Sequence, residues 1–150
     1  DNADYMQELE KGDITPIAGL LELLNMLKAQ KIPMVVASSA IRKNIDTVIS
    51  RFEIGSYFEG SVSGQEVERT KPNPEIFLKA AKVIDIKPEN CLVIEDAKHG
   101  VTAAKAAGMF CIALRNLNSG NQDLSQADLI VNSLSEIDLS VVNQLINKEK

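Results

Sequence analysis

Short apolar runs alternate with amphipathic segments along this chain, and that alternation restricts its fold more than any other feature. The sequence predicts strands at 34–37, 61–63, 91–95, 109–114 and 129–131, and helices at 16–30, 41–52, 74–85, 101–107 and 138–147. Strands separated by helices form right-handed βαβ units, which place the strands parallel to one another. We therefore expect an α/β fold built on a parallel sheet.

Three boundaries carry residues that commonly start or stop helices. Thr15-Pro16 predicts an N-cap followed by the first helical residue, because proline fits the first turn of a helix. Asn73-Pro74 predicts a cap ahead of the helix at 74–85. Gly108 follows an alanine-rich segment, where glycine commonly ends a helix in the left-handed conformation.

Composition and charge argue against several classes of protein. The chain has 150 residues, 45% of them hydrophobic and 25% charged, which suits one soluble globular domain. Its net charge of −5 and its lack of a basic run argue against nucleic-acid binding. No apolar stretch approaches the roughly 20 residues that a membrane span requires. Cys91 and Cys111 lie in separate apolar runs, so we expect buried free thiols in the cytoplasm.

Polar side chains follow three of the predicted strands at the point where each strand ends. Ser38 and Ser39 follow the first strand, Lys71 lies in the loop after the second, and Glu95 and Asp96 end the third. Ligands of open parallel sheets bind beyond the carboxyl ends of the strands. If these strands are near neighbours, the three groups converge on one site.

Each of these groups also has a purely structural interpretation. Ser38 could cap the next helix, Lys71 could be a solvated surface residue, and Glu95 and Asp96 could interact with a helix dipole. However, the prolines of the segment 70–74 stiffen the backbone around the lysine. Adjacent carboxylates repel at a buried strand end unless a cation compensates, and hard oxygen ligands beside a phosphate favour Mg²⁺. We therefore favour the functional interpretation.

Other polar residues are weaker candidates. His99, the only histidine, follows the two acids and is expected to have a surface or capping role. Arg42 and Lys43 are expected on a solvated helix face, and Arg115-Asn116 could line the site after a later strand.

The motifs resemble those of the haloacid dehalogenase-like superfamily, in particular its branch of β-phosphoglucomutase-like phosphatases and mutases. The segment 35–38 is similar to the second motif of that family, 71–77 to the third, and 93–100 with 103–109 to the fourth. The resemblance runs from about residue 14 to residue 131. It implies a Rossmann-like three-layer α/β/α core that lacks the usual first central strand.

The resemblance also implies a role for each candidate residue. Ser38, with Ser39 beside it, would bind the transferring phosphoryl group, and Lys71 would neutralise charge on that group and on an aspartate nucleophile. Glu95 and Asp96 would hold Mg²⁺. These roles suit phosphoryl transfer, which depends on in-line positioning and on cations near the equatorial oxygens.

The largest departure from the family is the absence of its first motif. That motif is Asp-x-Asp at the end of the first strand, and no Asp-x-Asp occurs in the 150 residues. Residues 1–13 resemble the end of a cap helix and its hinge, and 14–150 resemble an incomplete core domain. We expect the missing strand to come from a segment outside this numbering or from another chain, unless the gap collapses.

These observations favour a Mg²⁺-dependent phosphatase acting on a small phosphorylated metabolite such as a sugar phosphate. Ile41-Arg42 and Ala97 stand where mutases of the branch tend to carry Lys-Asn and Ser, which favours a phosphatase over a mutase. A phosphosugar mutase, or an inactive fragment that binds only phosphate or a partner, is the alternative. By itself this chain is expected to be inactive.

Overall fold

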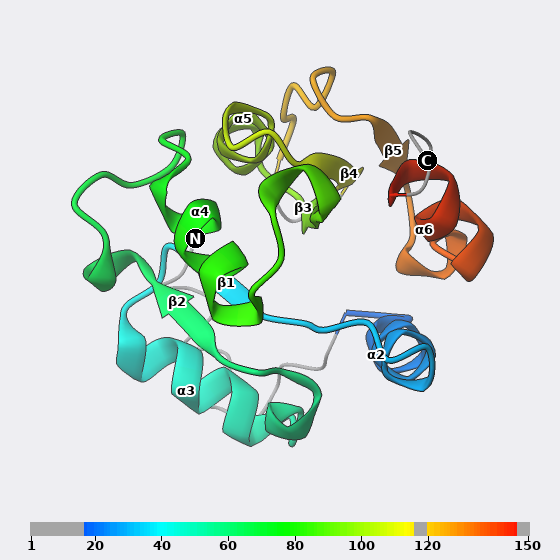
Figure 1. Ribbon diagram of the computed structural model, residues 1–150, viewed down its shortest axis with the longest axis horizontal. Coiled ribbons are helices and arrows are strands. Elements are labelled where there is room, and N and C mark those ends of the chain that lie inside the picture. The colour runs from blue at the N-terminus through cyan, green and yellow to red at the C-terminus, as the bar shows by residue number, and fades with distance from the viewer. Residues whose placement is uncertain (1–16, 116–119, 147–150) are drawn as a thin grey trace.

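The computed structural model describes residues 17–115 and 120–146, in which helices and strands alternate until two strands follow one another at 110–114 and 129–131 (Figure 1). The helices are α2 (Leu20–Ala29), α3 (Arg42–Arg51), α4 (Glu75–Ile84), α5 (Lys98–Ala106) and α6 (Leu139–Ile146). The strands are β1 (Val36–Ser38), β2 (Ser61–Ser63), β3 (Leu92–Glu95), β4 (Phe110–Leu114) and β5 (Leu129–Val131). All five predicted strands and all five predicted helices are present, and the expected α/β class is confirmed.

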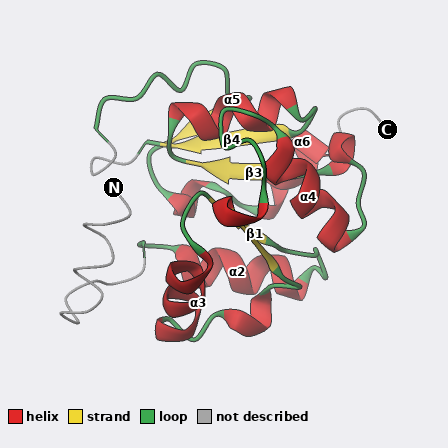
Figure 2. Cartoon of the chain, turned by 90° about the vertical axis from the view of Figure 1, so that its left-hand side faces the viewer, coloured by secondary structure: helices red, strands yellow, loops and turns green. Residues whose placement is uncertain are grey.

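The strands form two parallel sheets instead of the single expected sheet. β1 pairs with β2, while β3, β4 and β5 form the second sheet in that order. Ala37 lies opposite Val62 in the first sheet, and Val93 lies opposite Cys111 in the second. β1 and β3 are therefore both edge strands, and Figure 2 shows them apart from one another.

Helices pack on both faces of the larger sheet. One hydrophobic cluster joins α4 and α5 to β3 and β4, and a second joins α2 and α6 to β4 and β5. The sequence of β4 explains this arrangement, because Cys111 and Ala113 belong to the first cluster while Ile112 and Leu114 belong to the second. Side chains alternate between the faces of a strand, so an uninterrupted apolar run supplies both layers.

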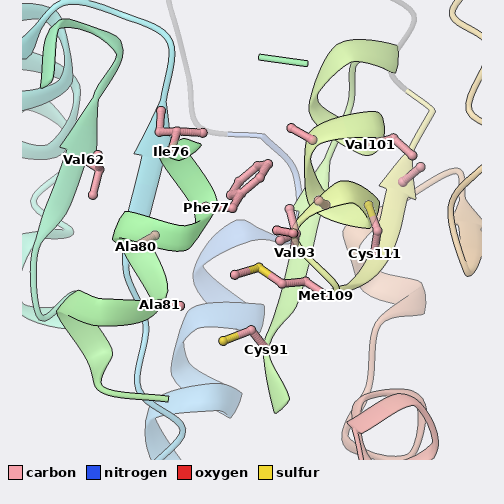
Figure 3. Close-up of a cluster of buried hydrophobic side chains, with 14 of the residues drawn as sticks. Val62, Ile76, Phe77, Ala80, Ala81, Cys91, Val93, Val101, Met109 and Cys111 are labelled. Carbon is pink, nitrogen blue, oxygen red and sulfur yellow. The ribbon is translucent and has the colours of Figure 1, made fainter. Parts of the chain in front are cut away.

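Helix α4 connects the two sheets through the first cluster. Its residues Ile76 and Phe77 are buried together with Val62 of β2 and Val93 of β3. In Figure 3 the ring of Phe77 extends from α4 to a position beside Val93, with Met109 below both in this view. The sheets are thus held in one core although β1 and β3 do not pair.

The first long helix begins later than the sequence predicts. It was expected from residue 16, but α2 starts at Leu20, after Gly19 at φ 85°. That left-handed conformation favours glycine, and a Cβ at this position would lie 3.3 Å from the backbone nitrogen of Ser135. Residues 1–13, Thr15 and Pro16 lie outside the described residues.

Two other predicted helix ends are confirmed. Asn73 Oδ1 accepts a hydrogen bond from the Glu75 backbone N–H at 3.0 Å, at the start of α4. Gly108 has φ 79° just beyond α5, as expected of a glycine that ends a helix. α5 itself begins at Lys98, three residues earlier than predicted, and so includes His99 and Gly100.

The burial of Ile112 on β4 can be tested by measuring how much its side chain stabilises the fold. The side chain of Ile112 is 0% exposed, whereas that of Ile130 on the neighbouring strand is 38% exposed. We expect Ile112→Ala to lower the free energy of unfolding by about 2–5 kcal/mol, because it removes buried methyl groups and leaves a cavity. Urea denaturation measures this loss. Ile130→Ala is the matched control, and an equal loss in both variants would contradict the described burial.

No helix in the described ranges is both long and apolar enough to cross a bilayer.

Candidate active site

A cavity of about 720 Å³ lies between the two sheets. Its apolar walls include Ala37 of β1 and Ile94 of β3, together with side chains of α2 and α6. Ile94 is 37% exposed although it lies within an apolar strand. The predicted site residues Ser38, Ser39, Lys71, Glu95 and Asp96 all line this cavity. The structure therefore brings together three groups that are widely separated in the sequence.

Lys71 and Glu95 form an ion pair at the carboxyl end of β3. Lys71 Nζ lies 2.9 Å from Glu95 Oε2, and the two side chains are only 12% and 13% exposed. The ammonium group also lies 4.9 Å from the centre of the Phe77 ring. These contacts hold Lys71 at the cavity, so it is not the solvated surface lysine of the structural interpretation.

The segment that leads to Lys71 is itself anchored to α4. The Glu75 carboxylate accepts hydrogen bonds from the backbone N–H groups of Glu68 at 2.9 Å and Arg69 at 3.2 Å. The hydrogen bond from Glu68 is the main reason that the pKa of Glu75 lies below its usual value. Because Glu75 opens α4, the helix fixes the approach of the chain to Lys71.

Gly100 leaves space for the side chain of Glu95. A Cβ on Gly100 would lie 2.0 Å from Glu95 Cδ and 2.1 Å from Oε2. The Glu95 carboxylate therefore lies against the first turn of α5, and its Oε1 accepts hydrogen bonds from the backbone N–H groups of Asp96 (3.1 Å) and Ala97 (3.4 Å), just before that helix. The absence of a side chain at Gly100 thus determines where this carboxylate can lie.

The donor set fits part of a magnesium site. Glu95 uses three of the roughly four lone-pair positions of a carboxylate on Lys71, Asp96 and Ala97, which leaves about one for a cation. Asp96 supplies a second carboxylate on the same cavity. Mg²⁺ requires about six oxygen ligands, and no group of three metal-ligating side chains occurs within 17–115 and 120–146. The remaining ligands would come from water, substrate or another segment.

Ser38 ends β1 and does not cap the helix that follows. Its Oγ accepts a hydrogen bond from the Ala40 backbone N–H at 3.1 Å, within the loop. The N-cap of α3 is Ile41, which makes no side-chain capping bond. Ser38 and Ser39 therefore belong to a turn at the cavity.

Arg42 was expected on a solvated helix face, and its side chain is indeed 33% exposed. The sequence did not reveal its partners: the guanidinium donates hydrogen bonds to both oxygens of Glu66 and to Ser61 O at 2.9 Å. Bonding to Glu66 is the largest cause of its raised pKa. Glu66 lies 24 positions further along the chain, so no local pattern reveals the pair. Lys43, in contrast, is exposed as expected.

The remaining candidates differ in whether they line the cavity. His99 is exposed and lines the cavity beside Asp96. Arg115 is exposed and is not among the residues that line the cavity, and Asn116 lies outside the described residues.

The thiols of Cys91 and Cys111 are free and buried, as predicted. Burial raises the pKa of Cys111 to about 12, so it is not a nucleophile at neutral pH.

Comparisons with known proteins agree with this fold. The chain is 40% identical over 127 residues to the bifunctional riboflavin kinase/FMN phosphatase of Arabidopsis thaliana, covering 84% of this chain and 34% of that protein. It is 34% identical over 146 residues to the β-phosphoglucomutase of Bacillus subtilis, covering 95% of this chain and 61% of that protein. The chain thus spans less than two thirds of either relative.

A solved structure and a family model give the same result. The structure of CbbY from Rhodobacter sphaeroides in complex with phosphate superposes with a TM-score of 0.86, covering 95% of this chain and 65% of that one. At 24% identity this likeness shows the fold alone. The model of the haloacid dehalogenase-like hydrolases matches residues 2–114. The chain belongs to the haloacid dehalogenase-like hydrolase family.

Proposed function

We propose that this chain forms most of the core of a Mg²⁺-dependent phosphatase acting on a small phosphorylated metabolite such as a sugar phosphate. The observation that carries the proposal is the convergence of Ser38, Lys71, Glu95 and Asp96 on one cavity. A cation, a hydroxyl group and two carboxylates at the ends of parallel strands are the groups that phosphoryl transfer requires.

Each residue has a distinct task in this proposal. Lys71 stabilises negative charge on the phosphoryl group and stays oriented by its ion pair with Glu95. Ser38 and the turn that it begins bind the phosphoryl oxygens. Glu95 and Asp96 would hold Mg²⁺, and the cation would supply positive charge that stabilises the transferring phosphoryl group.

The nucleophile belongs to a strand that we place between β1 and β3. Both are edge strands that line the apolar cavity, and they do not pair with one another, so the gap has not collapsed. An extended apolar segment in this position would satisfy the unpaired backbone groups of both edges. We propose that this strand ends in Asp-x-Asp and comes from outside this numbering or from another chain.

We refer to this chain together with that strand as the assembled protein. The 150 residues alone carry no Asp-x-Asp and are therefore expected to turn over no phosphate ester. Reading the coding sequence upstream of Asp1 tests the source of the strand. An apolar run ending in Asp-x-Asp supports the enzyme, whereas a start codon directly before Asp1 supports an inactive phosphate-binding or partner-binding protein.

A phosphosugar mutase is the second candidate, because the relative from Bacillus subtilis is a β-phosphoglucomutase at 34% identity. A phosphatase agrees better with Ile41-Arg42 and Ala97, and the relative from Arabidopsis thaliana is an FMN phosphatase. Arg42 is occupied by Glu66 and Ser61, which leaves it poorly placed to bind a second phosphate of a sugar.

A panel of phosphomonoesters distinguishes the two candidates. The assembled protein would be tested with p-nitrophenyl phosphate, hexose phosphates and FMN in the presence of Mg²⁺, and both free phosphate and isomerised sugar phosphate would be measured. We expect free phosphate as the product. Isomerisation of a hexose phosphate without phosphate release would favour the mutase.

A further inference from the structure

The turn that begins at Ser38 is held in place by residues at the end of β2. Ser63 Oγ donates a hydrogen bond to the Ala40 carbonyl at 2.6 Å. The backbone N–H of Arg42 donates to Gln65 Oε1 at 2.7 Å. Two contacts from one short segment thus flank the turn that carries Ser38 and Ser39.

Gly64 lies directly against the backbone of the same turn. A Cβ on Gly64 would lie 2.5 Å from the Ser39 carbonyl oxygen and 3.1 Å from Ser39 Cα. The obstructing atoms are backbone, so they cannot move aside as a flexible side chain can. Any residue with a side chain at position 64 must displace Ser39, because the two backbones approach too closely.

The segment that makes these contacts is itself rigid. Ser63 is 0% exposed, its Oγ accepts a hydrogen bond from the Gln65 N–H at 3.1 Å, and its own N–H donates to Glu66 Oε1 at 2.7 Å. Glu66 also accepts from Arg42 Nη2 at 2.6 Å, on the first turn of α3. The end of β2 and the start of α3 are therefore locked on either side of the turn.

We propose that Ser63 and Gly64 are positioning residues, which set the place of the Ser38–Ala40 turn and thereby the affinity of the site for the phosphoryl group. This inference rests on the proposed function, since it assumes that the turn binds phosphate. Neither residue lines the cavity, so both act through the turn. On the metal side of the cavity, Glu95 makes its hydrogen bonds to Lys71, Asp96 and Ala97, not to Ser63 or Gly64.

The variants Gly64→Ala and Ser63→Ala of the assembled protein test the inference. In Gly64→Ala we expect KM for p-nitrophenyl phosphate and the inhibition constant of inorganic phosphate each to rise about tenfold or more, because small misplacements of binding groups are costly. The Mg²⁺ activation constant should stay within about twofold. Ser63→Ala should change the same two constants in the same direction through release of the Ala40 carbonyl.

Gly55→Ala is the matched control, because its Cβ would meet only Ile49 Cγ2 at 3.4 Å, an ordinary contact. A purely structural role would lower the folded fraction and hence kcat, with KM and the phosphate inhibition constant unchanged. That pattern in both Ser63→Ala and Gly64→Ala would overturn the inference.

Hydrogen–deuterium exchange separates this inference from the proposed function. Exchange of the peptide that contains residues 38–42 should be faster in Gly64→Ala than in Gly55→Ala, whether or not the protein turns over. Unchanged exchange would overturn the inference. If the unmodified assembled protein releases no phosphate while the exchange differs, the proposed function fails and the positioning of the turn stands.

Discussion

Replacement of Asp96 by asparagine is expected to lower Mg²⁺-dependent phosphate release by the assembled protein roughly a thousandfold. Asparagine keeps the size of the side chain but removes the negative charge that attracts the cation. Glu95 cannot compensate, because most of its lone-pair positions are already used by Lys71 and by two backbone N–H groups. A Mg²⁺ titration of p-nitrophenyl phosphate hydrolysis measures the loss.

Asp46→Asn is the control for this experiment. Asp46 lies on α3 with its side chain 62% exposed, and it is not among the residues that line the cavity, so the same change in charge occurs outside the site. We expect its activity and its Mg²⁺ dependence to match those of the unmodified protein. Activity of Asp96→Asn equal to that of Asp46→Asn would show that Asp96 is not a metal ligand.

Removal of the Lys71 charge is expected to affect both activity and stability. In Lys71→Met the phosphoryl group loses its cation, and we expect kcat to fall about 100- to 1000-fold. The stability of the fold should decrease by about 1–3 kcal/mol, because the 13% exposed Glu95 carboxylate loses its partner. Activity assays and urea denaturation measure the two effects.

Magnesium should offset part of the stability loss, because a cation at Glu95 takes the place of the lysine charge. We therefore expect Mg²⁺ to raise the Tm of Lys71→Met more than that of the unmodified protein. Lys82→Met, on the exposed face of α4, is the matched control and should change neither kcat nor the stability of the fold. Equal kcat in the two variants would exclude a catalytic role for Lys71.

Local patterns predicted most of the elements and the convergence of the candidate site residues on one cavity. Apolar runs marked the strands, and Gly108 marked a helix end, because such signals depend only on neighbouring residues. That convergence was predictable because strand ends carry Ser38 and Glu95 directly, and the ends of parallel strands share one edge of a sheet.

Contacts between distant segments could not be predicted in the same way. The pairing of Arg42 with Glu66 and the approach of Gly64 to Ser39 join residues more than 20 positions apart. The late start of α2 depends on Gly19 meeting Ser135, which is a contact of the folded chain. Within 17–115 and 120–146 no strand lies between β1 and β3, and local sequence could predict each strand but not their division into two sheets.

The central claim is that the cavity between β1 and β3 becomes a Mg²⁺-dependent phosphatase when a strand ending in Asp-x-Asp completes it. The most direct test measures phosphate release from p-nitrophenyl phosphate by the 150 residues alone and by the assembled protein, each with Mg²⁺ and with EDTA. We predict release only by the assembled protein and only with Mg²⁺. Equal release by the 150 residues alone, or release by the assembled protein that EDTA does not reduce, would contradict the claim.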